Sequence, residues 1–141
     1  MKAMAWFEKA AVRNNAYAQH NIAHMYQNGL GVTQDYVKAR EWYEKAAVNG
    51  IAKSQYELGR MYAEGSGGKQ DYLKAAEWYR KAADNDYADA EYQIGLMYRF
   101  GLGFTQDDGK AAEWFRRSAD HGHNAAKIQL KKLSADLPSA N

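Results

Sequence analysis

The stretch Trp42-Tyr43-Glu44-Lys45-Ala46-Ala47 decides the fold, because closely similar stretches occur three more times along the chain. They begin at Trp6, Trp78 and Trp114, so the four tryptophans follow one another at a constant spacing of 36 residues. A constant period of about 20 to 50 residues is the signature of a stacked repeat array. The sequence therefore predicts one structural unit that is used several times in succession.

Each unit divides into two predicted helices. The first is clearest from Ile51 to Glu64, where apolar or small residues recur at the spacing of one helix face. The second is predicted from Tyr36 to Asn49, where an apolar stripe runs through Ala39, Trp42 and Ala46. Neither helix can bury its stripe alone, so neighbouring pairs have to stack and share a core. We expect an all-α solenoid of antiparallel helix pairs, about eight helices in all.

Residues that favour turns and caps recur where these helices should end. A glycine in the left-handed conformation should close each first helix, and an aspartate should cap the start of each second helix. Each second helix should be followed by a residue that tolerates positive φ. The closing glycines are Gly29, Gly65 and Gly101, with Gly31, Gly67 and Gly103 two residues on; the caps are Asp35, Asp71 and Asp107; the turn residues are Asn14, Gly50, Asp86 and Gly122.

Two glycines lie inside predicted helices, where glycine costs about 1 kcal/mol relative to alanine. Gly59 and Gly95 occupy the same position of successive units, and Ala23 is the third member. We expect close helix packing there, with a tryptophan or tyrosine of a neighbouring helix over the gap. Truncating one of the repeated tryptophans should then cost about 3–5 kcal/mol.

The spacing also predicts the organisation of the chain. A half repeat (1–14), three repeats (15–50, 51–86 and 87–122) and a capping helix (123–133) should form a single domain, followed by a flexible tail (134–141). Lys131 stands where Gly95 would recur, which is typical of a polar terminal cap. Met1, Met4 and Trp6 make the start apolar. This open end indicates a fragment of a longer array or a surface for self-association.

Composition excludes several classes of function. The chain has 19 basic and 17 acidic residues, well interspersed, which gives no electrostatic footprint for nucleic acid. It has no cysteine, so thiolate metal sites are excluded. No apolar run approaches the roughly 18 residues of a membrane span, and the first residues do not form a signal peptide. The compartment stays open: cytoplasmic by default, periplasmic or secreted for a mature form or a fragment.

Repeat two carries a family resemblance. Gln-Tyr-Glu-Leu-Gly-Arg-Met-Tyr at 55–62, followed by Gly65, Gly67, Asp71 and the stretch that begins at Trp78, closely resembles the Sel1-like repeat, a relative of the tetratricopeptide repeat. The resemblance extends over residues 1 to about 133. The departures from the pattern are Gly68, Gly109 and His20.

The resemblance implies a right-handed αα-superhelix whose first helices line a concave face. It implies a non-catalytic scaffold or adaptor for protein interactions, without a cofactor and usually bacterial. Relatives are often periplasmic or secreted and serve signalling, virulence, envelope assembly or effector immunity.

Function should lie where the units differ, and the first helices have one face that does not repeat. Spacings of three and four residues place each set on one side of its helix, which is the concave side by analogy with the tetratricopeptide arrangement. Tyrosine and arginine are frequent interface anchors. The alternative is a solvated face that nothing constrains. The predicted partner-binding residues, for a protein or peptide, are Tyr17, His20, His24, Asn28, Lys53, Tyr56, Glu57, Arg60, Glu64, Asp89, Tyr92, Gln93, Leu96, Arg99 and Phe100.

Other readings are weaker. Ser66-Gly67-Gly68-Lys69 has the Ser-x-x-Lys spacing of penicillin-interactive enzymes, but the serine is in a glycine loop and the companion motifs of a weak β-lactam-binding hydrolase are missing. The same loop lacks the Ser or Thr after the lysine of a phosphate-binding loop. A spacer segment of a larger protein is a further alternative.

The histidines give no predicted metal site. His20 and His24 are four residues apart on one helix face, but a third ligand is not evident. His121 and His123 flank Gly122, and we expect them to be solvent-exposed caps.

Overall fold

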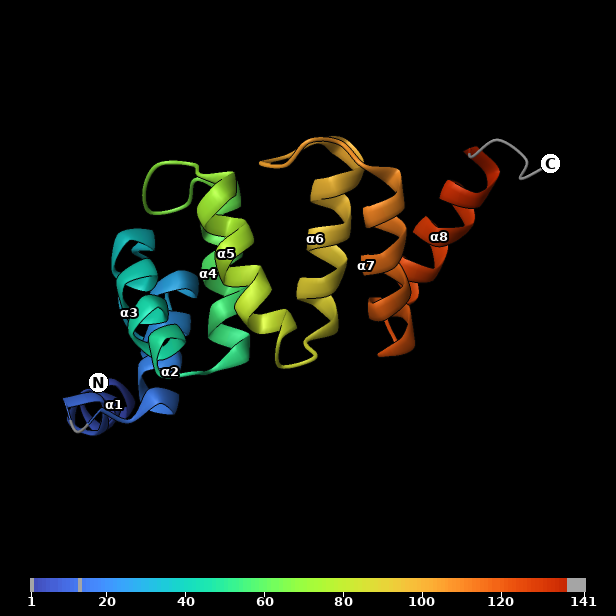
Figure 1. Ribbon diagram of the computed structural model, residues 1–141. Helices are drawn as coiled ribbons and strands as arrows, with labels where there is room; N and C mark the ends of the chain where they lie inside the picture. Colours follow the sequence, from blue (N-terminus) through green and yellow to red (C-terminus); the bar gives the residue numbers. More distant parts are fainter. Residues whose placement is uncertain (1, 13, 137–141) are drawn as a thin grey trace. The chain divides into compact units, whose positions relative to one another are not determined.

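The computed structural model describes residues 2–12 and 14–136, which form α-helices and, within these ranges, no β-strand. The predicted all-α fold is confirmed. The helices are α1 (Lys2–Val12), α2 (Ala16–Asn28), α3 (Tyr36–Val48), α4 (Ala52–Glu64), α5 (Tyr72–Ala83), α6 (Ala88–Phe100), α7 (Asp108–Asp120) and α8 (Asn124–Asp136) (Figure 1).

The chain forms two compact units, Met1–Trp78 and Tyr79–Asn141, and the division falls inside α5. In the first unit, α1 packs on α2, α2 on α3, and α3 on α4. In the second unit, α6 packs on α7 and α7 on α8. Within each unit, these successive helices are therefore neighbours in space, as a repeat array requires. Figure 1 shows α6 and α7 running in opposite directions, joined by a loop at one end.

The predicted turn chemistry is confirmed at both ends of the helices. Gly29 closes α2 with φ 66°, and its backbone N–H donates to the carbonyl of Met25. Asp35 caps α3 by accepting a hydrogen bond from the backbone N–H of Lys38 at 3.1 Å. Asn14 and Asp86 adopt φ of 61° and 60°, which few residues other than glycine tolerate. Local sequence alone thus sets where these helices begin and end.

The core is built on the aromatic residues that follow Trp42, Trp78 and Trp114, more than on these tryptophans. Tyr43, Tyr79 and Phe115 are fully buried. Trp6 is 64% exposed, and only Trp114, at 8%, is buried. The exposure of Trp6 does not fit the expected loss of about 3–5 kcal/mol on truncating a repeated tryptophan, which requires a buried side chain. In the repeats of Trp42, Trp78 and Trp114, the adjacent position is therefore the more deeply buried one.

Close helix packing is confirmed at Gly95, with a different partner. A Cβ atom built on Gly95 of α6 would lie 2.5 Å from the Phe115 ring of α7. The two helices approach closely enough that no side chain fits between them. The aromatic ring over the gap is thus a phenylalanine, where tryptophan or tyrosine was expected.

The two ends of the chain differ from the prediction. Met4 is buried in a cluster with Ala11, Ile22 and Met25, so it does not contribute to an exposed apolar start. Met1 lies outside the described residues. Helix α8 continues to Asp136, which makes residues 134–136 helical where a tail was expected. The other tail residues, 137–141, are outside the described ranges.

Candidate functional site

A polar hollow lies between α2 and α4, in the first unit. We call it the α2–α4 hollow. Its volume is about 400 Å³. Seven of the predicted partner-binding residues line it, which are His20, His24, Asn28, Lys53, Glu57, Arg60 and Glu64. The remaining lining residues are Gln27, Gln34, Tyr36, Tyr43 and Ser66. Two first helices thus contribute their non-repeating side chains to one concave site.

Charged side chains of both signs face this hollow. The guanidinium of Arg60 lies 3.8 Å from Glu57 and 3.4 Å from Glu64, both on the same helix. Lys53 adds a second cation one turn before Glu57. Because Arg60 and Glu64 are well exposed, their ion pair contributes little to stability. Polar groups of a ligand can therefore replace these ion pairs at a low cost in free energy.

Tyr43 forms the buried floor of the hollow. Its hydroxyl group donates a hydrogen bond to Gln27 Oε1 at 2.6 Å. Burial, with a smaller contribution from Glu57, raises the pKa of Tyr43, so the phenol stays neutral. The floor is consequently a buried, uncharged surface beside the charged side chains of α4.

His20 links the two helices across the hollow. Its Nδ1 lies 2.6 Å from the hydroxyl oxygen of Ser54, a fully buried residue of α4. Burial, assisted by the positive charge of Lys53 and by His24, lowers the pKa of His20 to about 4. The imidazole is therefore neutral at neutral pH, and it acts as a hydrogen-bonding strut.

This lowered pKa predicts an acid-dependent loss of stability. A histidine with a folded-state pKa near 4 and an unfolded value near 6.5 binds a proton more readily when unfolded. Its contribution is complete above pH 6.5 and declines as the pH falls towards 4. Denaturant unfolding of the wild type and His20→Gln across pH 8 to 4.5 measures this. The stability advantage of the wild type should shrink below pH 6.5, and an advantage independent of pH would contradict the assignment.

Two predicted residues of the first unit do not line the α2–α4 hollow. Tyr17 is highly exposed near the start of α2, and Tyr56 is half-buried on α4. The hollow is also lined by Gln34 and Ser66, from the loops after the first helices, which the helix spacing did not predict. Gln34 reaches back to donate a hydrogen bond to the Gln27 carbonyl at 2.8 Å. Gln70 makes the same bond to the Ala63 carbonyl in the next repeat. The recurrence of this glutamine 36 residues later in the sequence could have identified it as a loop residue with a fixed position.

In the second unit, the predicted face of α6 is partly covered by the chain's own C-terminal residues. Tyr92 stacks on His123 with ring centroids 4.5 Å apart. Asp89 lies 2.9 Å from His123 Nε2, and Arg99 donates a hydrogen bond to Gln129 of α8. Leu96 packs against the core cluster around Phe115. Gln93 is half-buried, while Phe100 is exposed.

Of the two histidines that flank Gly122, His121 is exposed as expected, whereas His123 is half-buried, so the expectation of solvent exposure is wrong for His123. His123 is packed against Tyr92, and its Nδ1 accepts a hydrogen bond from the backbone N–H of Ala126. His121 Nδ1 lies 2.7 Å from Glu91 Oε1. Both rings therefore connect α6 to the residues that follow α7.

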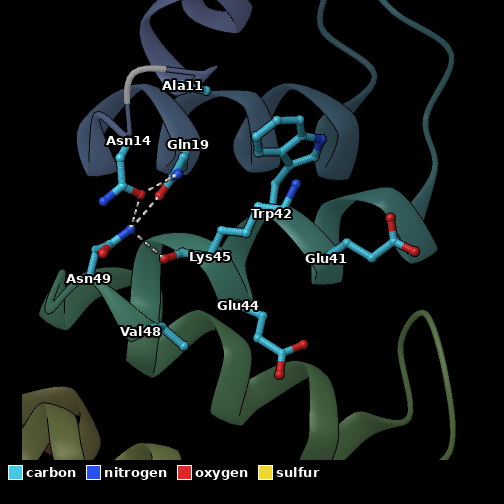
Figure 2. Close-up of a pocket in the computed structure, with 9 residues that line it drawn as sticks. All are labelled: Ala11, Asn14, Gln19, Glu41, Trp42, Glu44, Lys45, Val48 and Asn49. Carbon is cyan, nitrogen blue, oxygen red and sulfur yellow. Dashed lines mark hydrogen bonds between the residues drawn. The ribbon is translucent and has the colours of Figure 1, made fainter.

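A second hollow of about 680 Å³ lies beside Trp42, between α1 and α3. Its walls include the exposed Val48 and the Lys45 side chain, whose ammonium group is 4.1 Å from the centre of the indole. At one end, the amides of Asn14, Gln19 and Asn49 bond to one another (Figure 2). None of these residues belongs to the predicted face.

The profile of the Sel1 repeat matches residues 1–15, 16–50, 52–87 and 88–123. The chain belongs to the Sel1 repeat family. These four segments account for most of its length, and each begins within one residue of a repeat boundary expected from the tryptophan spacing.

Solved structures share this Sel1 repeat fold. One is c5321, a protective antigen of uropathogenic Escherichia coli with an SLR fold, at 36% identity and TM-score 0.90 over 92% of this chain. A Sel1 repeat protein from Oxalobacter formigenes has 39% identity and TM-score 0.78 over 83% of the chain. Helicobacter pylori cysteine rich protein B is similar in fold alone, with 23% identity and TM-score 0.69 over 92% of each chain.

The present chain spans 28% of the c5321 structure and 47% of the Oxalobacter one. A search of curated proteins found no match. Sel1 repeats generally mediate protein–protein interactions and are generally non-catalytic. In the described part of this Sel1 repeat chain, every helix is too short or too polar to cross a lipid bilayer.

Proposed function

We propose that this Sel1 repeat chain is a non-catalytic adaptor whose α2–α4 hollow binds a segment of a partner protein. The observation that supports the proposal is the gathering of seven non-repeating side chains around one concavity. In an array where the structural positions recur every 36 residues, side chains that do not recur are free to serve recognition. Because they come together from two helices, one ligand can contact all of them.

The chemistry of the hollow indicates a polar, extended or helical peptide. Lys53 and Arg60 offer positive charge, and Glu57 and Glu64 lie beside them, so a ligand with both acidic and amide groups fits. His20 and Tyr43 are neutral, and they add directional hydrogen bonding without net charge. The carbonyl and N–H groups of a peptide backbone match such a mixed surface.

The exposed part of the α6 face is proposed as a second recognition patch. Phe100 is exposed, and the guanidinium of Arg99 lies 5.4 Å from the centre of its ring. An aromatic ring next to an arginine is a frequent interface anchor. This patch belongs to the second unit, and its contribution can be measured separately with Phe100→Ala.

Replacing both cations of the hollow should weaken peptide binding. Peptides would be selected from a random displayed library on the wild type, and their affinities measured by fluorescence anisotropy. For peptides that occupy the hollow, Lys53→Gln/Arg60→Gln should raise the Kd at least about tenfold, which corresponds to about 1.4 kcal/mol. The variant removes positive charge but leaves the buried floor intact.

The matched control is Lys131→Gln/Lys132→Gln, which makes the same change in charge on exposed positions of α8. It should leave the Kd unchanged. Circular dichroism establishes that both variants keep their helices. If the selected peptides bind the Lys53 and Arg60 variant as tightly as the wild type, or if selection enriches no peptide, the α2–α4 hollow is not the binding site.

A further inference from the structure

A cluster of ionisable side chains lies in the second unit, on residues that neither proposed peptide site uses. The Glu91 side chain is completely buried on α6, and His121 Nδ1 lies 2.7 Å from its Oε1. The other ring nitrogen of His121 is 3.9 Å from Asp86 Oδ1. One potential ligand atom from each of these residues lies within 4.8 Å of the other two. Three donors from three separate segments thus converge.

The first unit contains the same cluster in neutral form. Asn14, Gln19 and Asn49 stand two periods before Asp86, Glu91 and His121, respectively. Their amides are joined by hydrogen bonds, with Asn49 Nδ2 donating to both Asn14 Oδ1 and Gln19 Oε1 at 3.0 Å (Figure 2). Three hydrogen-bonded amides are therefore sufficient for the fold at this place. The charges of Asp86, Glu91 and His121 are not required for the same structural role.

A second observation concerns Glu91 itself. Its Oε2 atom is buried, and no described residue donates a hydrogen bond to it. The nearest cation is Arg117, whose Nε is 3.3 Å away, within ion-pair distance. Arg117 is therefore the cation that balances Oε2, and Oε1, which faces His121, is the oxygen available to an ion.

We propose that Asp86, Glu91 and His121 bind a divalent transition-metal ion of the zinc type. One imidazole nitrogen and two carboxylate oxygens are a ligand set that suits Zn²⁺ and similar ions, while water fills the other positions. Metal–ligand distances of about 2.0–2.2 Å require the ligand atoms to be about 3–3.5 Å apart. Asp86 can move closer to the other two ligands to reach these distances, because its side chain is 72% exposed.

Arg117 limits how tightly the ion is held. Its guanidinium already balances part of the Glu91 charge, and a dication beside it experiences repulsion. The arginine side chain is nearly half exposed and stacks on Trp114, with 4.5 Å between the guanidinium carbon and the ring centre. It can therefore stay on Oε2 and orient the carboxylate, while Oε1 turns to the ion. A site of moderate affinity is expected.

The test is a calorimetric titration of the full chain with ZnCl₂ at neutral pH. The wild type should bind one equivalent at this site. The variant Asp86→Asn/Glu91→Gln/His121→Asn should lose that equivalent, or bind it at least tenfold more weakly. This variant recreates the amide trio of the first unit, so it is expected to fold. His121→Asn alone is a second variant that leaves the buried residues unchanged.

A control separates this site from the other histidine pair. His20→Gln/His24→Gln removes the only histidines of the first unit, and it should keep the equivalent that the amide variant loses. With Co²⁺ in place of Zn²⁺, visible absorption reports binding independently of heat. The proposal is overturned if the wild type binds no ion, or if the amide variant and His121→Asn both bind as tightly as the wild type.

Discussion

Phe115→Ala should lower the free energy of unfolding by about 3–5 kcal/mol, which is typical of removing a fully buried phenylalanine. The Phe115 ring has 0% of its surface exposed, and it packs against Ala126 and Leu133 of α8. Its removal leaves a cavity that the surrounding helices cannot close. Urea unfolding followed by circular dichroism measures the loss.

The control is Trp6→Ala, because Trp6 is the tryptophan of its repeat and yet is 64% exposed. This substitution should change stability far less than Phe115→Ala does. The comparison separates the structural residue of the repeat from its most recognisable one. An equal loss of unfolding free energy in the two variants would show that the exposed indole stabilises the fold as much as the buried phenylalanine does.

Gly95→Ala should destabilise the protein by about 1–3 kcal/mol, as overpacking a core does. Alanine is ordinarily better than glycine inside a helix by about 1 kcal/mol. Here the new methyl group would lie 2.5 Å from a Phe115 ring atom. The ring is completely buried, so it has little room to move. The steric cost should therefore exceed the gain in helix propensity, as thermal and urea unfolding would show.

Gly109→Ala is the matched control, because it makes the same substitution in α7 where only Asp107 Oδ1, at 3.3 Å, is close. This variant should be neutral or more stable. Combining Gly95→Ala with Phe115→Leu tests the cause, since a smaller side chain should relieve part of the clash. The close-packing explanation fails if Gly95→Ala raises stability as much as Gly109→Ala does.

The sequence predicted the helices and their ends well, because the signals there are local. A glycine such as Gly29 or a cap such as Asp35 acts within a few residues, so its meaning does not depend on the rest of the fold. It did not predict which aromatic residue enters the core. Trp114 and Phe115 are adjacent on one broad apolar stripe, and periodicity alone does not rank them. Their burial depends on the neighbouring helix.

The candidate site was predicted in part for the same reason. His20, Lys53 and Arg60 lie on helix faces, and the three- and four-residue spacing identifies such faces. The contribution of Gln34 depends on how the following loop folds back on α2. The partial cover over Tyr92 and Arg99 depends on α8, which departs from the repeat pattern. Both effects are tertiary, and spacing does not encode them.

The two trios at equivalent positions have a consequence for how such proteins evolve. One backbone arrangement holds either the amides around Gln19 or the charged groups around Glu91, so exchanging one for the other needs only point substitutions. Because the Glu91 side chain is completely buried, its ion pairs are screened by dissolved salt much less than exposed pairs are. A lineage can therefore introduce charge at this place without making the segment strongly sensitive to ionic strength, while the helices and their spacing stay as they are.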